Sequence, residues 1–167
     1  MIYLLDADVL IRAHEDHYPI DRVPQFWEWI ENRSIAGTIK IPFEIHDEIA
    51  TSKGLLHDWV CDPMRQPHLI LDEEIDQNRL QQVFVEGYQI NFSDAEVEKT
   101  GRDPFLITYA LGKDDRTVVT RETSKPSRTG ANQHIPDVCR KLNIPCINDF
   151  KLYRELNFTT KESARSR

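Results

Sequence analysis

The chain has 167 residues, of which 40% are hydrophobic and 29% are charged. This length suits one domain whose core needs neither disulfides nor structural zinc. We expect residues 1–158 to form that domain and the basic segment 159–167 to be a disordered tail. No apolar run approaches the roughly 18 residues that cross a bilayer. The first run carries Asp6 and Asp8 without a basic leader, so we expect no signal peptide and a cytoplasmic protein.

The formal net charge of −7 counts against a general nucleic-acid binder, because neutralisation of phosphates drives such binding. The argument weakens if some of the acids hold divalent cations. Positive charge gathers in residues 113–128 and in the tail at Lys161, Arg165 and Arg167. A solvated loop and tail is the alternative interpretation. The three cysteines form no CxxC pair, which argues against a disulfide framework and a zinc site.

Apolar and β-branched runs alternate with helical patterns in the first part of the chain. Between expected strands at residues 2–5 and 38–41, apolar side chains in residues 23–30 recur at the spacing of a helix with one buried face. Pro42 suits the first turn of the next helix, and we expect Gly54 to end that helix.

The middle of the chain is more helical. Residues 55–60 and 75–85 carry helical patterns, and Ser93 suits the N-cap of a further helix. Asp103 suits the N-cap of a helix whose first residue is Pro104. The remaining elements that we expect are a strand at 117–120, a loop at 122–133, a helix that begins near Pro136, a strand at 145–147 and a helix at 149–156. This alternation predicts a three-layer α/β/α fold with a mostly parallel central sheet.

Four acid-bearing segments lie where strands end or helices begin. Asp6 ends the first strand, Glu44 and Glu48 lie one helical turn apart after the second, Asp103 begins a helix, and Glu122 follows the third strand. Because the carboxyl ends of parallel strands meet at one edge of a sheet, these acids can converge there. Mg²⁺ and Mn²⁺ prefer carboxylate oxygens. The pattern therefore indicates a metal-dependent nuclease.

Each acid also has a plain structural explanation. Asp103 can serve only as a helix cap, Glu44 and Glu48 can be surface residues, and Glu122 can belong to a loop. Asp6 is the hardest to explain in this way, because a carboxylate straight after an apolar strand is costly to bury without a partner.

The order of these segments resembles the PIN domain family of metal-dependent ribonucleases, which includes VapC-type toxins. The resemblance covers about residues 2–150. Residues 5–11 look like the family's first motif, with Asp8 where asparagine is common. Residues 41–49 are similar to the second, with Glu48 the better match to its acid and Glu44 the fallback.

The third and fourth motifs of the family also have counterparts. Residues 102–110 resemble the third, with Asp103 as its acid, and residues 118–122 resemble the fourth, with Glu122 in place of aspartate. The resemblance implies that Thr120 orients a ligand or the attacking water. It implies that the ligands of Mg²⁺ or Mn²⁺ are Asp6, Glu48, Asp103 and Glu122, with Glu44 and Asp8 as fallbacks.

The resemblance further implies an endoribonuclease that is the toxin of a toxin–antitoxin pair. An antitoxin protein would block the site, and a homodimer is expected. Arg121, Lys125 and Arg128 are candidates to hold the RNA backbone. The insert at 51–101 is longer than that of a minimal toxin, and the loop after Glu122 and the segment at 134–139 resemble an uncharacterised PIN-like branch rather than the best-known toxins. We therefore expect the family's ribonuclease activity in this chain, whereas the resemblance does not identify the RNA that is cut.

Two other functions stay open. Residues 6–10 also resemble the signature of haloacid-dehalogenase-type phosphatases, in which Asp6 would be the nucleophile and Asp8 a general acid or base. Leu10 departs from that signature, and no acidic pair follows a later strand. The third possibility is a PIN-like binding module without activity, against which the acids in all four segments argue.

Overall fold

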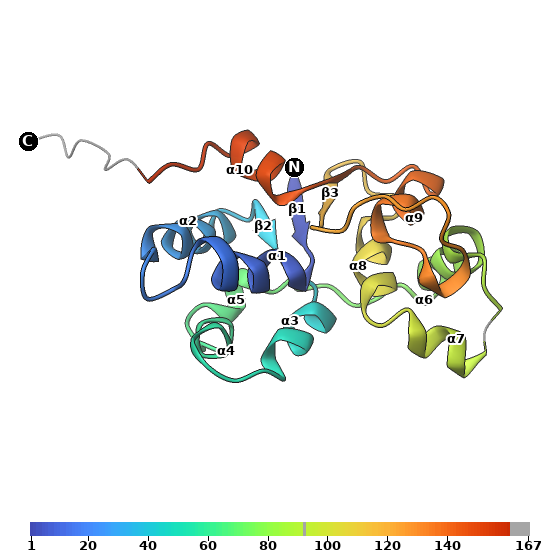
Figure 1. Ribbon diagram of the computed structural model, residues 1–167, viewed down its shortest axis with the longest axis horizontal. Helices are drawn as coiled ribbons and strands as arrows, with labels where there is room; N and C mark the ends of the chain where they lie inside the picture. Colours follow the sequence, from blue (N-terminus) through green and yellow to red (C-terminus); the bar gives the residue numbers. More distant parts are fainter. Residues whose placement is uncertain (92, 161–167) are drawn as a thin grey trace, which may run out of the picture.

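Four short runs of mostly apolar residues pair side by side into one parallel sheet. The structure, a computed structural model, describes residues 1–91 and 93–160. Within that part the strands pair in the order β2-β1-β3-β4 (Figure 1). In chain order they are β1 (Ile2–Leu5), β2 (Ile39–Lys40), β3 (Arg116–Val119) and β4 (Cys146–Ile147). The α/β class and the parallel sheet expected from the sequence are confirmed.

Helices connect the strands and surround the sheet. The α-helices are α1 (Ala7–Arg12), α2 (Pro24–Ile35), α3 (Phe43–Ala50), α4 (Leu55–Val60), α5 (Gln66–Leu69), α6 (Gln77–Gln82), α7 (Asp94–Lys99), α8 (Asp103–Ala110), α9 (Ile135–Lys141) and α10 (Asp149–Glu155). The π-helical turns are η1 (Ala13–His17) and η2 (Val83–Tyr88), and η3 (Gly130–Asn132) is a 3₁₀ turn.

Several expected boundaries were wrong. The chain turns into α1 directly after Asp6, where we expected no helix. Gly54 does not end α3, which stops at Ala50; with φ of 104° it precedes α4 instead. Arg102 occupies the N-cap position of α8, and Asp103 is the first helical residue rather than the cap. Periodicity finds a helix but says little about its last turn, where local capping competes with packing.

The register places helices on both faces of the sheet. Ile2 pairs with Arg116 and Tyr3 with Thr117, and side chains alternate between faces along a strand. Arg116 donates to the carbonyl of Tyr109 in α8 at 2.7 Å, whereas Tyr3 donates to Glu155 in α10 at 2.8 Å. Helices α8 and α10 therefore cover opposite faces, which gives the three-layer α/β/α arrangement visible in Figure 1.

Both sides of the sheet are sealed by apolar packing. The side chains of Leu4, Leu5, Val118 and Val119 have no solvent exposure. No helix in residues 1–91 and 93–160 combines the length and apolar character that crossing a bilayer requires. Lys161, Arg165 and Arg167, part of the tail expected to be disordered, lie outside the described residues.

Candidate functional site

Asp6 and Thr120 meet at the carboxyl edge of the sheet because β1 and β3 are in register. Leu5 pairs with Val119, so the next residue on each strand projects beyond the same edge. The hydroxyl of Thr120 donates to Oδ2 of Asp6 at 2.8 Å. Both residues are buried, with 7% of Asp6 and 1% of Thr120 exposed. The pair forms the floor of the candidate site.

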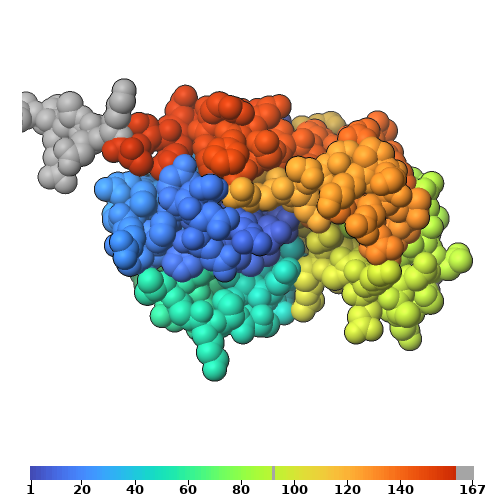
Figure 2. Space-filling model, viewed as in Figure 1, coloured from blue at the N-terminus to red at the C-terminus, as the bar shows by residue number. Residues whose placement is uncertain are grey.

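Glu122 reaches the same edge through the backbone that follows β3. Its amide donates to Oγ1 of Thr120 at 3.1 Å, so one hydroxyl links Asp6 to the Glu122 segment. Its Oε2 accepts from the amide of Ile135 at 2.7 Å, and Oε1 lies 4.0 Å from Nδ1 of His134. Glu122 thus ties the edge of the sheet to the first turn of α9. Figure 2 shows the orange segment after β3 lying beside the blue N-terminal part.

Asp103 and Glu48 come from helices α8 and α3, which pack against each other. Arg102, next to Asp103, pairs with Asp47, next to Glu48, through Nη2 and Oδ2 at 3.0 Å. Both partners are close to half-exposed, so this pair orients the two helices more than it stabilises them.

The electrostatics of these acids show that the fold brings them together. Burial, followed by the charges of Asp6, Glu122, Glu48 and Asp8, raises the pKa of Asp103 to about 8. Burial also raises the pKa of Asp6 to about 7; the hydrogen bond from Thr120 lowers it, and Asp8, Glu122 and Glu48 add to the rise. Five acids from four separate segments of the sequence therefore lie close enough for their charges to act on Asp6 or Asp103.

Glu48, not Glu44, belongs to this group. Partial loss of water and the charge of Asp8 raise the pKa of Glu48, and Arg102 lowers it. Glu44 points elsewhere: its Oε1 accepts from the hydroxyl of Tyr109 at 3.4 Å, and its buried Oε2 has no hydrogen-bond partner among the described residues.

The expected RNA-binding cations are distributed differently. Arg121 turns toward Asp149, with Nη1 and Oδ2 3.4 Å apart, and its Cζ lies 5.7 Å from the ring centre of Phe150. It is therefore already paired with a carboxylate, and this carboxylate is none of the proposed metal ligands. Lys125 and Arg128 are exposed on the loop after β3, and within the described chain their side chains form no ion pair.

Comparison with family models gives one match. Residues 3–160 match the model described as a domain of unknown function, DUF4411. The chain belongs to the DUF4411 family. No curated protein matches it. The family membership covers nearly the whole chain and leaves the chemistry to be argued from the site.

The donor set of this DUF4411 chain suits a hard divalent cation. The converging groups are carboxylates, which Mg²⁺ and Mn²⁺ prefer, and two of them have pKa values raised by burial and repulsion that a cation would offset. Among the described residues, no three His, Cys, Asp or Glu side chains are already close enough together to hold one ion. Asp8 and Glu48 are exposed, so solvent rather than packed side chains surrounds much of their surface.

Two buried polar residues near the site escaped the sequence analysis. The hydroxyl of Tyr88 is fully buried and has no hydrogen-bond partner among the described residues. Burial raises its pKa well above the usual value, and the charges of Asp103, Glu122 and Asp6 add to the rise. Asp149, 2% exposed, begins α10 at the end of β4. The position of Asp149 after a strand was a usable signal, because Asp6 follows its strand in the same way. Nothing in the pattern around Tyr88 distinguishes it from an ordinary core tyrosine.

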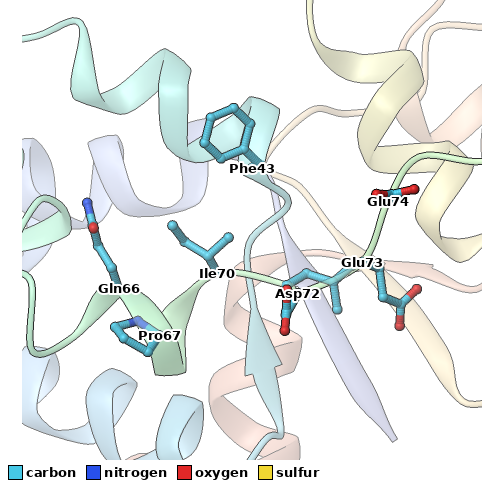
Figure 3. Close-up of a pocket in the computed structure, with 8 residues that line it drawn as sticks. Phe43, Gln66, Pro67, Ile70, Asp72, Glu73 and Glu74 are labelled. Carbon is cyan, nitrogen blue, oxygen red and sulfur yellow. The ribbon is translucent and has the colours of Figure 1, made fainter.

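A cavity of about 610 Å³ lies away from the acids (Figure 3). It is bordered by Phe43 at the start of α3 and by the segment from Gln66 to Glu74. None of Asp6, Glu48, Asp103 and Glu122 lines it. The DUF4411 chain therefore has an apolar hollow with an acidic rim that is distinct from the candidate site.

Asp137 anchors the loop that carries Glu122. Its carboxylate accepts from Ser124 Oγ at 2.5 Å, from the amide of Lys125 at 2.6 Å and from Arg140 Nη1 at 3.2 Å. Burial alone would raise the pKa of Asp137, but these hydrogen bonds and the charge of Arg140 lower it below its usual value. The loop is thus held by a charged acceptor rather than by apolar packing.

We expect Asp137→Asn to lower the free energy of unfolding at pH 7 by about 1.5–3 kcal/mol, the range for hydrogen bonds to a charged group. Chemical denaturation measures this difference, with Asp114→Asn, an exposed loop acid, as the control. A carboxyl with a lowered pKa stabilises the fold above its unfolded pKa, and this stabilisation is lost as the pH falls through the folded value. The two chains should therefore become equally stable in acid. Equal stability at pH 7 would show that the anchor contributes nothing.

Proposed function

We propose that this chain is a Mg²⁺- or Mn²⁺-dependent endoribonuclease with a PIN-like site. The observation that carries the proposal is the convergence of Asp6, Asp8, Glu48, Asp103 and Glu122: burial first, and then the charges of the other four acids, raise the pKa of Asp103 to about 8. Such repulsion costs stability unless something offsets it. A divalent cation bound among the carboxylates offsets it directly.

In this proposal the cation is held by Asp6, Glu48, Asp103 and Glu122. When bound, it supplies an activated water and stabilisation of the charge on the phosphate. Thr120 donates to Oδ2 of Asp6 and so fixes the carboxylate at the floor of the site. The amide of Ile135 holds Oε2 of Glu122, which orients the other oxygen. Lys125 and Arg128, on the exposed loop, are available to hold the RNA backbone.

The biological role that we propose is that of a toxin. A partner antitoxin would cover the acids, and a homodimer would present two sites. Expression of the chain alone should then arrest growth of the host cell, and Asp6→Asn should relieve the arrest.

The phosphatase alternative receives weaker support. It needs Asp6 as an ionised nucleophile, yet burial raises the pKa of Asp6 to about 7 and Oδ2 already accepts from Thr120. It also assigns no role to Asp103 and Glu48, which share the same electrostatic environment as Asp6.

The decisive comparison uses two glutamates of the same helix, one turn apart. With Mn²⁺ present, we expect Glu48→Gln to reduce cleavage of single-stranded RNA by at least about 100-fold. Loss of a residue that only supports a metal ligand already costs about 10–100-fold. Glu44→Gln is the matched control and should cleave nearly as well as the wild type.

Hydrolysis of p-nitrophenyl phosphate, assayed in parallel, tests the phosphatase alternative. Phosphatase activity that needs Asp6 but not Glu48 would replace the nuclease proposal. If the wild-type chain cuts no RNA and binds no Mn²⁺ in calorimetry, the inactive binding module is the alternative that remains.

A further inference from the structure

A second cavity opens directly beside the acids. Its volume is about 390 Å³, within the roughly 300–1,000 Å³ of small-molecule sites. Thr120 and Glu122 form one wall, so it continues from the candidate site. The start of α10, with Asp149 and Phe150, also lines the cavity. Whatever binds at the acids can extend into this cavity.

Two charged groups in the cavity have hydrogen-bonding capacity that the fold does not use. Arg121 Nη1 and Asp149 Oδ2 lie 3.4 Å apart, yet both atoms are buried and neither makes a hydrogen bond within the described residues. Asp149 is only 2% exposed. Buried polar atoms are almost always hydrogen-bonded, because a buried atom that makes no hydrogen bond has lost its bonds to water without replacement. Arg121 and Asp149 thus form an ion pair at the wall of a cavity, and neither of these two atoms makes a hydrogen bond within the described residues.

The same wall offers an aromatic surface. Phe150 is 43% exposed, unusual for a phenylalanine, and its ring lies 5.7 Å from Cζ of Arg121. An exposed aromatic ring beside an arginine is the arrangement on which nucleobases stack in single-stranded RNA complexes.

We infer that this cavity is a nucleobase subsite, which receives a base of the RNA next to the phosphate held at the acids. The base stacks on Phe150, and its edge pairs with Arg121 as donor and Asp149 as acceptor. The inference rests on the proposed nuclease function and adds to it the part of the substrate that is recognised. It also revises the role of Arg121, which we expected to hold the RNA backbone.

Charge favours a base over a phosphate at this place. Asp149 and Glu122 are carboxylates and repel an anion, whereas Arg121 is already paired with Asp149. Every nucleobase edge presents a donor or an acceptor that matches one member of such a pair. The base therefore fits the cavity, and the phosphate belongs at the metal.

The test measures binding apart from cleavage. Fluorescein-labelled 2′-O-methyl RNA hexamers of A, C or U are titrated in the presence of Ca²⁺, and a gel confirms that the probes stay intact. Phe150→Ala should weaken binding by about 5–150-fold, the range for loss of one base–aromatic stack. Phe150→Tyr keeps the ring and should bind nearly as well as the wild type. Phe43→Ala removes another exposed phenylalanine, in the larger cavity, and should have no effect.

Competition separates the base from the backbone. Nucleoside monophosphates should displace the hexamer from the wild type, and ribose 5-phosphate, which lacks a base, should not. Asp149→Asn, which converts an acceptor oxygen into an amide, should change the order of preference among the bases. Equal competition by ribose 5-phosphate would overturn the inference.

The outcomes distinguish this inference from the nuclease proposal. If hexamer binding depends on Phe150 but the chain cleaves no RNA in Mn²⁺, the subsite inference holds and the nuclease proposal is rejected. Cleavage with an unchanged affinity and cut pattern in Phe150→Ala would keep the nuclease and reject the subsite. A wild-type chain that binds no hexamer would also reject the subsite.

Discussion

Asp103→Asn is expected to abolish RNA cleavage and, in the absence of metal, to make the protein more stable. The loss of activity should reach at least about 100-fold, because the variant removes a charged oxygen from the proposed metal ligands. The gain in stability follows from burial and from the neighbouring acids, which together raise the pKa of Asp103 to about 8. Asparagine has nearly the same shape and carries no charge to repel Asp6 and Glu122.

Cleavage of labelled RNA in Mn²⁺ and thermal unfolding in EDTA at pH 8 measure the two effects. Asp94→Asn is the matched control, since Asp94 is also the first residue of a helix, α7, but is exposed. It should leave cleavage unchanged and lower Tm slightly, because an acid near a helix N-terminus is favourable. A large fall in Tm for Asp103→Asn would mean that the carboxylate is held by attractive partners, which contradicts our account of the site.

Stability without metal should fall as the pH rises from about 4 to about 8. Unfolded aspartates titrate near pH 3.9, whereas the pKa is raised to about 7 for Asp6 and to about 8 for Asp103 in the folded chain. Between these limits the folded state holds more protons than the unfolded state, so the free energy of unfolding decreases with pH. The stabilisation is complete below pH 4 and is lost as the pH passes through the folded values.

Mg²⁺ or Mn²⁺ should reverse this loss. A ligand at 100 times its Kd stabilises the folded state by about 2.7 kcal/mol, which corresponds to about 5–10 °C in Tm for a chain of this size. The rise should be larger at pH 8 than at pH 6, because at pH 8 fewer protons must leave the carboxylates before the cation binds.

Urea denaturation across this pH range, with and without cation, provides the measurement. The double variant Asp6→Asn, Asp103→Asn should lose most of the pH slope and most of the response to cation. KCl at matched ionic strength controls for screening. If the wild type and the double variant show the same slope between pH 5 and pH 8, the two acids are not coupled as we describe.

The fold could be read from the sequence to a large extent. The run at 2–5 is β1, and the β-branched run expected at 117–120 is β3, shifted by one residue. These signals are local, because a buried strand needs consecutive apolar side chains and a surface helix needs them at every third or fourth position. The helix α1 was missed because Val9, Leu10 and Ile11 continue the apolar run of β1, and such a run cannot be assigned to helix or strand by periodicity.

The choice of acids depended on the fold more than on the pattern. Glu44 and Glu48 lie one turn apart on one helix, and in the sequence only the resemblance to the family's motif favoured Glu48. Packing of α3 against α8 places Glu48 near Asp103, and Tyr109 takes Glu44 away from it. Arg121 was assigned to the RNA backbone from its charge alone, and its contact with Asp149 became visible only when β4 was placed beside β3.

The sequence by itself determined the α/β class, the parallel sheet and the segments that carry acids, since each rests on spacing between near neighbours along the chain. The tertiary structure decided which acids lie together, which pKa values rise, and that a cavity lined by the ion pair of Arg121 and Asp149 adjoins them. These properties depend on distances between residues more than a hundred positions apart, such as Asp6 and Thr120. Burial and Coulomb repulsion act across such distances in space, and local periodicity carries no record of them.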